Sequence, residues 1–299
     1  MKTPTLFSVS YAGLWGQARL DLKSFLVKAA KLGYPAVELM GKRPHLSVLD
    51  ADPRRVSELR DAAAAAGVQI ATIAGYTNFT LGRDTEIPSV EIQVAYVRQL
   101  ASLAQQLGAK IVRIFTGYVT EREAFQRDWD LCVQGVRESA AAAAEYGVIL
   151  GVQNHHDVGV GVDSYVEFLD EVDHPNCRAM FDPWSPALHG EDLRACARHL
   201  APRMVQTTLA DYVRVPRYAY QPGLVNYERL ADAVRAVPLG CGFLDLEGFF
   251  AGLREGGFDG YVAYEMCSPL RGGGSEENLD RTARASLDVI RKLTATGTV

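Results

Sequence analysis

The chain has 299 residues, of which 48% are hydrophobic and 22% are charged. This globular composition excludes a disordered chain, a collagen-like repeat and a small disulfide-stapled domain. The 31 basic and 36 acidic residues give a formal net charge of −5, which offers no general attraction for nucleic acid. The length suits an α/β barrel, and we expect residues 1–299 to form one domain.

The cysteines and the apolar runs indicate in which cellular compartment the protein is expected. The five cysteines are scattered, and no two of them form a C-x-x-C pair. We therefore expect neither a disulfide framework nor a zinc site built from thiolates. The N-terminal stretch lacks the pattern of a signal peptide, and no later run reaches the ~20 apolar residues of a membrane span. These observations predict a cytoplasmic protein with no membrane partner.

A recurring pattern leads from a helical stretch, through glycine, into a short apolar run. Glycine ends helices in the left-handed conformation, and a parallel strand buried on both faces needs a continuous apolar run. Each copy of the pattern therefore predicts a helix end followed by a strand. The copies lie at 31–39, 65–74, 106–115, 145–153 and 256–265.

Three further apolar runs bring the number of expected strands to eight, at 6–11, 177–182 and 204–210. Helices are expected between the strands, at 21–32, 54–66, 88–107, 121–146, 163–173, 191–200, 245–255 and 276–293. This alternation predicts a single (β/α)8 TIM barrel of the α/β class. An open doubly wound sheet is the alternative, but no G-x-G-x-x-G follows the first strand. We expect residues 211–226 to form a long irregular loop, with a short helix after it.

Acidic residues end three of the otherwise apolar strands: Glu38, Asp182 and Glu265. In a barrel of this type the chemistry gathers at the carboxyl ends of the strands, so we expect these side chains to converge on one mouth. Converging carboxylates repel each other unless a cation or a shared proton lies between them. The alternative is that each carboxylate caps a helix or pairs with an arginine such as Arg113.

Other candidate residues follow the same strand ends. His155 and His156 follow the fifth expected strand and have the chemistry of a metal ligand, a hydrogen-bond donor or a general acid and base. His45 lies in the loop after the second strand, and Trp184 offers an apolar face to a sugar ring. Arg217 and Arg271 lie on later loops, where they would bind an anionic or polyhydroxyl substrate. For the histidines and the loop arginines, the alternative is a structural or solvent-exposed role.

These residues resemble the xylose-isomerase-like barrel family, which includes tagatose and psicose epimerases, hydroxypyruvate isomerase and inosose dehydratase. The resemblance runs from the AVEL motif at 36–39 to GGFDGYVAYE at 256–265. It implies a divalent metal held by a Glu, an Asp, a His and a Glu at the ends of strands five to eight. Two of these positions match the pattern in this chain, Asp182 and Glu265.

The other two positions depart from the family pattern. Gln153 stands at the strand-five glutamate, and the strand-seven histidine falls on Thr208, with Gln206 as the other inward candidate. The ligand set implied by the resemblance is therefore Gln153, Asp182, Gln206 and Glu265, for Mn²⁺, Mg²⁺ or Co²⁺. A glutamine amide cannot remove a proton from carbon, so symmetric two-base epimerisation does not suit this pair.

The resemblance implies an isomerase or epimerase of a ketose, keto-inositol or related polyol. Glu265 would remove a proton next to a carbonyl, with His155 as the second catalytic group, while Glu38, His45, His156, Trp184, Arg217 and Arg271 would bind the substrate. A keto-sugar dehydratase or lyase is the alternative, because it needs only one base and one acid. A metal-free sugar-binding or partner subunit is the third possibility. The expected partner is a small carbohydrate, with no nucleic acid, and a homo-oligomer is possible.

Overall fold

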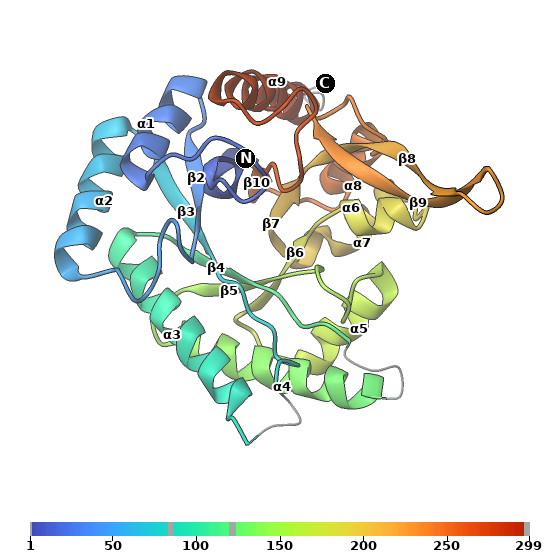
Figure 1. Ribbon diagram of the computed structural model, residues 1–299. Coiled ribbons are helices and arrows are strands. Elements are labelled where there is room, and N and C mark those ends of the chain that lie inside the picture. The colour runs from blue at the N-terminus through green and yellow to red at the C-terminus, as the bar shows by residue number, and fades with distance from the viewer. Residues whose placement is uncertain (1, 83–85, 120–123, 296–299) are drawn as a thin grey trace.

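In the computed structural model, eight parallel strands close into a barrel (Figure 1). The structure describes residues 2–82, 86–119 and 124–295. Around the barrel the strand order is β1-β10-β7-β6-β5-β4-β3-β2. The barrel strands are β1 (Thr3–Phe7), β2 (Ala36–Met40), β3 (Gln69–Ala74), β4 (Ile111–Ile114), β5 (Ile149–Gln153), β6 (Cys177–Phe181), β7 (Met204–Leu209) and β10 (Tyr261–Tyr264).

Helices surround the barrel, as the alternating sequence pattern predicts. They are α1 (Leu22–Leu32), α2 (Pro53–Ala66), α3 (Ser89–Leu107), α4 (Phe125–Ala144), α5 (Val162–Val172), α6 (Trp184–Leu188), α7 (Leu193–Leu200), α8 (Leu246–Glu255) and α9 (Glu276–Ala295). The (β/α)8 prediction is confirmed. The predicted start of the fourth helix, at 121–123, lies outside the described residues. None of the described helices is long and apolar enough to cross a membrane.

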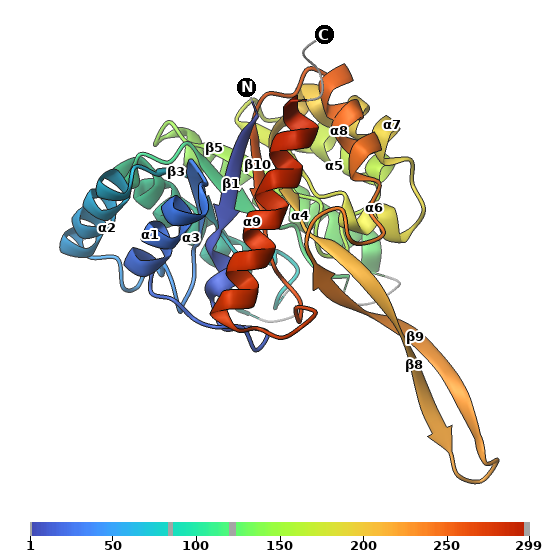
Figure 2. The same cartoon turned by 90° about the horizontal axis from the view of Figure 1, so that it is seen from above.

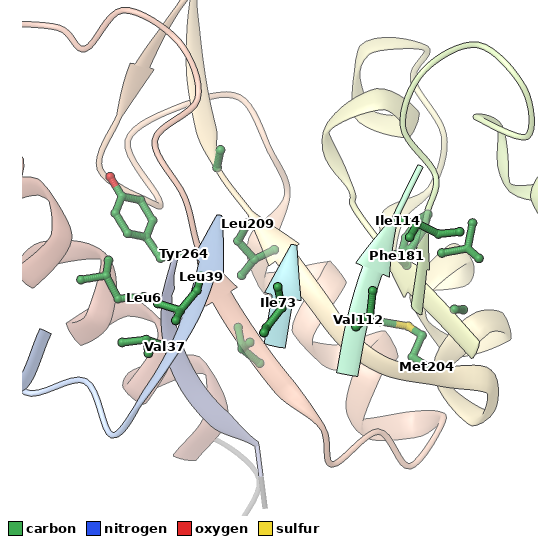
Figure 3. Close-up of a cluster of buried hydrophobic side chains, with 14 of the residues drawn as sticks. Leu6, Val37, Leu39, Ile73, Val112, Ile114, Phe181, Met204, Leu209 and Tyr264 are labelled. Carbon is green, nitrogen blue, oxygen red and sulfur yellow. The ribbon is translucent and has the colours of Figure 1, made fainter. Parts of the chain in front are cut away.

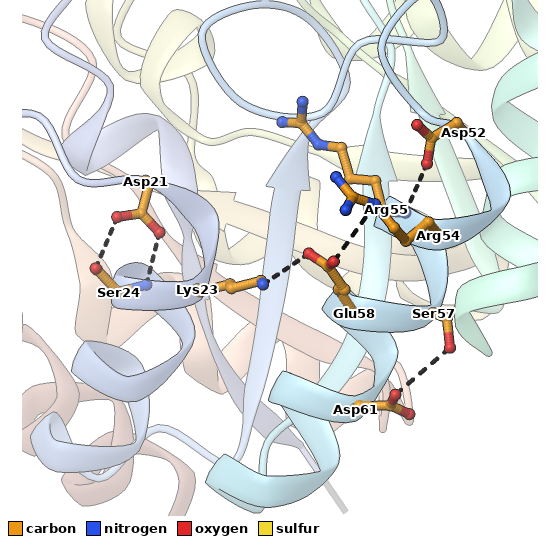
Figure 4. Close-up of polar contacts among 9 residues, drawn as sticks. All are labelled: Asp21, Lys23, Ser24, Asp52, Arg54, Arg55, Ser57, Glu58 and Asp61. Carbon is orange, nitrogen blue, oxygen red and sulfur yellow. Dashed lines mark hydrogen bonds and ion pairs between the residues drawn. The ribbon is translucent and has the colours of Figure 1, made fainter.

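Local sequence signals fix where several helices begin and end. Asp21 and Asp52 cap the N-termini of α1 and α2 by accepting hydrogen bonds from the backbone N–H groups of Ser24 and Arg55 (Figure 4). Gly33 and Gly67 end the same two helices in the left-handed conformation. Such caps satisfy backbone groups that a helix end otherwise leaves without partners.

The two faces of each barrel strand carry different residues. Apolar side chains on the outer face pack beneath the helices, as Val37 and Leu39 of β2 and Ile73 of β3 do (Figure 3). Polar side chains alternate with them and point into the barrel. Because side chains alternate along a strand, Glu38 and Thr72 lie inward, between those outward neighbours.

Two expectations about the secondary structure were wrong. The first strand ends at Phe7, and a 3-10 helix, η1 (Ser8–Tyr11), follows it. The predicted loop at 211–226 and the helix after it instead form an antiparallel hairpin, β8 (Asp211–Gln221) and β9 (Asn226–Val237). This hairpin leaves the barrel directly after β7 and projects well beyond it (Figure 2). Most of its residues lack the buried, alternating pattern that identifies a strand in a sequence.

Candidate active site

A charged network crosses the barrel interior. Arg113 on β4 is 1% exposed, and its Nε lies 3.5 Å from Oε1 of Glu38. Nε2 of Gln206 donates a hydrogen bond of 2.6 Å to the other carboxylate oxygen of Glu38. Oε1 of Gln206 accepts a hydrogen bond of 2.6 Å from the hydroxyl of Thr72. Burial raises the pKa of Glu38, whereas the charge of Arg113 opposes that rise. The pairing of Glu38 with an arginine, one of the expected alternatives, is thus observed.

Asp182 lies nearer the carboxyl ends of the strands. Its Oδ2 accepts a hydrogen bond of 3.0 Å from Nε2 of Gln153, and its Oδ1 accepts one of 2.9 Å from the backbone of Trp184. Asn154 accepts a hydrogen bond from the backbone N–H of Asp182 and donates one to its carbonyl. Burial raises the pKa of the Asp182 carboxyl, although both hydrogen bonds to the carboxylate oppose that rise. Asp182 is therefore held in one orientation.

Glu265 follows β10 and shares the mouth of the barrel with Asp182. Burial raises the pKa of Glu265, and the negative charge of Asp182 raises it further. The charge of Arg113 acts in the opposite direction. A carboxyl whose pKa is raised towards neutrality is a better proton acceptor from carbon than an ordinary glutamate. β6 and β10 lie on either side of β7, so Asp182 and Glu265, which directly follow these two strands, lie at the same end of the barrel.

His155 and His156 lie in an aromatic cluster over this space. The ring centroid of Phe115 is 4.9 Å from that of His155 and 4.5 Å from that of His156. Burial and the charge of Arg113 lower the pKa of His155 to about 4. Burial, His155, Arg113 and Lys42 lower the pKa of His156 to about 3. Both rings are therefore neutral at pH 7, and each can donate one hydrogen bond.

Unsatisfied polar atoms concentrate in the same region. Among the described residues, nine buried side-chain nitrogen or oxygen atoms lack a hydrogen-bond partner, and only one of the nine, in Ser139, lies away from the inner face and carboxyl ends of the barrel strands. The other eight atoms are Glu38 Oε1, Tyr76 Oη, Arg113 Nε and Nη1, His156 Nδ1, Trp184 Nε1, Thr208 Oγ1 and Ser268 Oγ. Two of the eight, Glu38 Oε1 and Arg113 Nε, face each other in the ion pair. Buried polar groups normally have partners, so the other six atoms mark a place for a polar ligand.

The remaining predicted residues lie elsewhere. His45 is buried, and its two ring nitrogens are 3.0 Å from Ser8 Oγ and 3.1 Å from the carbonyl of Leu20. Both nitrogens are thus engaged within the chain. Arg217 is exposed on the projecting hairpin, and Arg271 is exposed in the loop after β10. The structure does not bring these three side chains together with Asp182 and Glu265.

Sequence reasoning gave Arg113 only a pairing role. Among the described residues, Arg113 is the largest fully buried side chain. Its Cζ lies 4.1 Å from the ring centroid of Phe115 and 5.0 Å from that of Tyr76. The signal in the sequence was a single arginine within the apolar run IVRIF at 111–115. A buried cation in an otherwise apolar strand requires a partner across the barrel.

Comparison with known proteins places this architecture in a family. The family model for the xylose isomerase-like TIM barrel matches residues 26–293. The chain therefore belongs to the xylose isomerase-like TIM barrel family. Comparison with curated proteins gives no match.

Solved structures show the same fold at low sequence identity. A D-psicose 3-epimerase with D-tagatose, from Clostridium cellulolyticum H10, is 18% identical, with a TM-score of 0.75 over 98% of this chain and 99% of that one. A probable 3-DHS dehydratase from Bacillus anthracis is 18% identical, with a TM-score of 0.72 over 97% and 99%. A xylose isomerase-like TIM barrel protein from Mycobacterium smegmatis, in complex with magnesium, is 17% identical, with a TM-score of 0.69 over 99% and 97%. The neighbours thus include both an epimerase and a probable dehydratase.

Proposed function

We propose that the protein is a carbohydrate isomerase or epimerase that moves a proton on the carbon next to a carbonyl of a ketose, keto-inositol or related polyol. The carboxyls of Asp182 and Glu265 follow the two strands that flank β7, and unsatisfied polar atoms lie at the same strand ends; this arrangement carries the proposal. Glu265 is the base, because its pKa is raised while it remains at the mouth of the barrel. A polyol supplies the hydroxyl and carbonyl oxygens that the unsatisfied donors lack.

Arg113 stabilises the negative charge that forms on the substrate oxygen after proton removal. Its Nη1 is buried and lacks a hydrogen-bond partner among the described residues, so it can donate to that oxygen. A donor fixed beforehand in a dry site stabilises a developing oxyanion strongly. His155, neutral at pH 7, supplies a second hydrogen-bond donor, and the protonated Glu265 returns the proton to carbon. Trp184 and the ring of Phe115 provide apolar surfaces for the sugar carbons.

The donor atoms present do not suit the divalent metal centre that the resemblance implies. The amide of Gln206 is engaged at both ends, by Glu38 and Thr72, and the amide nitrogen of Gln153 points to Asp182. No group of three His, Cys, Asp or Glu side chains that could hold a metal occurs in the described part of the chain. The residues therefore do not fit the family's four-ligand centre, and the mechanism above needs no step through a metal. A site at Gln153, Asp182, Gln206 and Glu265 stays a prediction from the resemblance.

A variant that restores the family pattern tests whether the residues at positions 153 and 208 account for the poor fit to a metal. Gln153→Glu combined with Thr208→His would supply the missing carboxylate and imidazole. We expect elemental analysis to find about one equivalent of Mn²⁺, Co²⁺ or Mg²⁺ in this double variant, and far less in the parent protein. Stoichiometric metal in the parent that is lost in Glu265→Gln would instead support the ligand set implied by the resemblance.

Solvent exchange tests the proposed reaction. The protein is incubated in D2O with a panel of ketoses and keto-inositols, and NMR follows deuterium bound to carbon. We expect uptake with at least one substrate and a loss of 100-fold or more in Glu265→Gln. The matched control is Glu247→Gln, an exposed residue of α8, which should retain the parent rate. Absence of uptake across the panel would overturn the isomerase proposal.

A dehydratase is the second candidate function, because Gln153 stands where an epimerase of the family pattern has its second glutamate. In an elimination of water from a keto-sugar, Glu265 can remove the proton from carbon and pass it to the leaving hydroxyl, to which His155 can donate a hydrogen bond. In the same incubations a new enone absorbance, without deuterium in recovered substrate, would favour this function. Ligand binding without turnover, unchanged in Glu265→Gln, would instead favour a sugar-binding or partner subunit.

A further inference from the structure

Within the described part of the chain, nothing buries the hairpin β8–β9 for most of its length. Its strands have 11 and 12 residues, so it is roughly 35 Å long at about 3.4 Å per residue. Only its base is buried, at Asp211, Tyr212, Ala236 and Val237. Figure 2 shows the remainder, which we call the arm (residues 213–235), extending away from the barrel. A two-stranded ribbon with water on both faces is marginally stable by itself.

Large apolar and aromatic side chains gather at the end of the arm. Five of the thirteen exposed large hydrophobic side chains of the described residues lie within 218–227, namely Tyr218, Tyr220, Leu224, Val225 and Tyr227. Tyr220 and Tyr227 are paired across the two strands, and their ring centroids are 5.1 Å apart. Tyr218 lies two residues from Tyr220 and therefore on the same face. Tyrosine and arginine are enriched where protein interfaces derive their binding energy.

The size of the exposed surface agrees with an unpaired arm. The chain exposes 13560 Å², whereas a compact monomer of 32.7 kDa is expected to expose about 12,400 Å². The excess, about 1,100 Å², is comparable with the ~800 Å² that each partner buries in a standard protein interface.

The charge of the arm indicates which partner it fits. Residues 213–235 contain four arginines and two acids, a net charge of +2, which leaves −7 for the remainder of the chain. A basic, tyrosine-rich arm on an acidic body is complementary to the body of a second copy. If two copies are related by a two-fold axis, the arm of each copy packs on the body of the other. Both arms are then used, so the assembly stops at a dimer.

We propose that the arm is a dimerisation element that packs on a second copy of this chain. The contact uses the tyrosine face and the apolar turn at Leu224 and Val225. The free edge of β8 is a poor site for strand addition, because Pro216 and a register shift between Val215 and Arg217 interrupt it. At its base, Tyr212 packs against Trp184 with ring centroids 5.0 Å apart, so the arm begins beside the candidate active site.

Sedimentation velocity on the full chain tests the proposal. We expect a mass of twice 32.7 kDa at micromolar concentration, with weaker association at high salt. Tyr220→Ser with Tyr227→Ser should sediment as a monomer. Leu224→Ser with Val225→Asn should raise the dissociation constant at least tenfold, and asparagine suits the positive φ of 45° at Val225.

The matched control is Leu49→Ser, which removes a side chain that is 80% exposed outside the arm and should leave the dimer intact. Thermal unfolding of each variant checks that the barrel is folded. A parent protein that is monomeric up to about 100 μM, or a folded tyrosine variant that keeps the dimer mass, would overturn the proposal.

Discussion

The raised pKa of Glu265 is expected to make the stability of the protein depend on pH. Its pKa is raised above the ordinary value of 4.5, so the unfolded chain releases this proton at a lower pH than the folded chain does. The contribution of Glu265 to stability is therefore fully present below about pH 4.5 and is lost as pH rises through its folded pKa.

Glu265→Gln removes this titration. We compare the unfolding free energy of the variant with that of the parent. From pH 5 to pH 9 this difference should change in favour of the variant by more than about 1 kcal/mol, because a shift of one pKa unit is worth about 1.4 kcal/mol. Urea unfolding at both pH values measures the change, with Glu247→Gln as the control. Equal pH dependence in Glu265→Gln and the parent would mean that the Glu265 carboxyl titrates normally.

Arg113 and Glu38 are buried charges, and each depends on the other for its counter-ion. Arg113→Met alone leaves the carboxylate of Glu38 buried without its counter-ion, and we expect a loss of about 3–5 kcal/mol in unfolding free energy. Adding Glu38→Gln removes the orphaned charge and keeps an oxygen for the hydrogen bond from Gln206. The double variant should recover most of the loss, as measured by urea unfolding. A double variant less stable than Arg113→Met would show that the pair is not the source of the effect.

The loop after β9 is fixed to the base of the hairpin through Asp211. The carboxylate of Asp211 accepts hydrogen bonds from the backbone N–H groups of Gly240, Gly242 and Leu244, at 2.9, 2.8 and 3.3 Å. A Cβ added to Gly242 would lie 1.9 Å from Asp211 Oδ1, whereas one added to Gly223 in the hairpin turn would meet nothing within 4 Å.

We therefore expect Gly242→Ala to lower the unfolding free energy by about 2 kcal/mol or more, because the loop must shift. Gly223→Ala should be neutral or stabilising by up to about 1 kcal/mol. Thermal unfolding of the two variants side by side makes the comparison. Equal midpoints would show that the loop absorbs the extra methyl group without cost.

The elements that sequence analysis located are those with strong periodicity and caps. The left-handed glycines at Gly33, Gly67 and Gly108 mark helix ends, and the buried apolar runs after them are the barrel strands. The hairpin escaped this reasoning because most of its residues contact solvent on both faces, so no alternation between apolar and polar residues identifies it.

The candidate site was predictable only in part. Asp182 and Glu265 stand out as carboxylates that end apolar strands, and the barrel geometry places such ends together. The engagement of His45 with Ser8 and Leu20, and the network that joins Arg113 to Gln206 through Glu38, depend on distances across the barrel. Spacing along the chain carries no information about such distances.

The molecule as a whole divides into a closed barrel and an attached arm. β7 pairs with β10 directly, so the barrel closes without any hydrogen bond from β8 or β9. The register joins Tyr212 to Ala236 at the base of the hairpin, where a two-residue Asn-Gly turn can replace residues 213–235.

We expect the shortened protein to unfold within a few degrees of the parent midpoint, because the buried core lies in the barrel and its helices. Calorimetry of both proteins measures the midpoint, and Asp211→Ala in the shortened protein should lower it by releasing the loop at 240–244. If the shortened protein failed to fold while Asp211→Ala in the full chain folded normally, the arm would be part of the barrel's folding unit. If the shortened protein folds, the barrel does not need the arm for folding. Association between copies is then the physical reason for so exposed a ribbon.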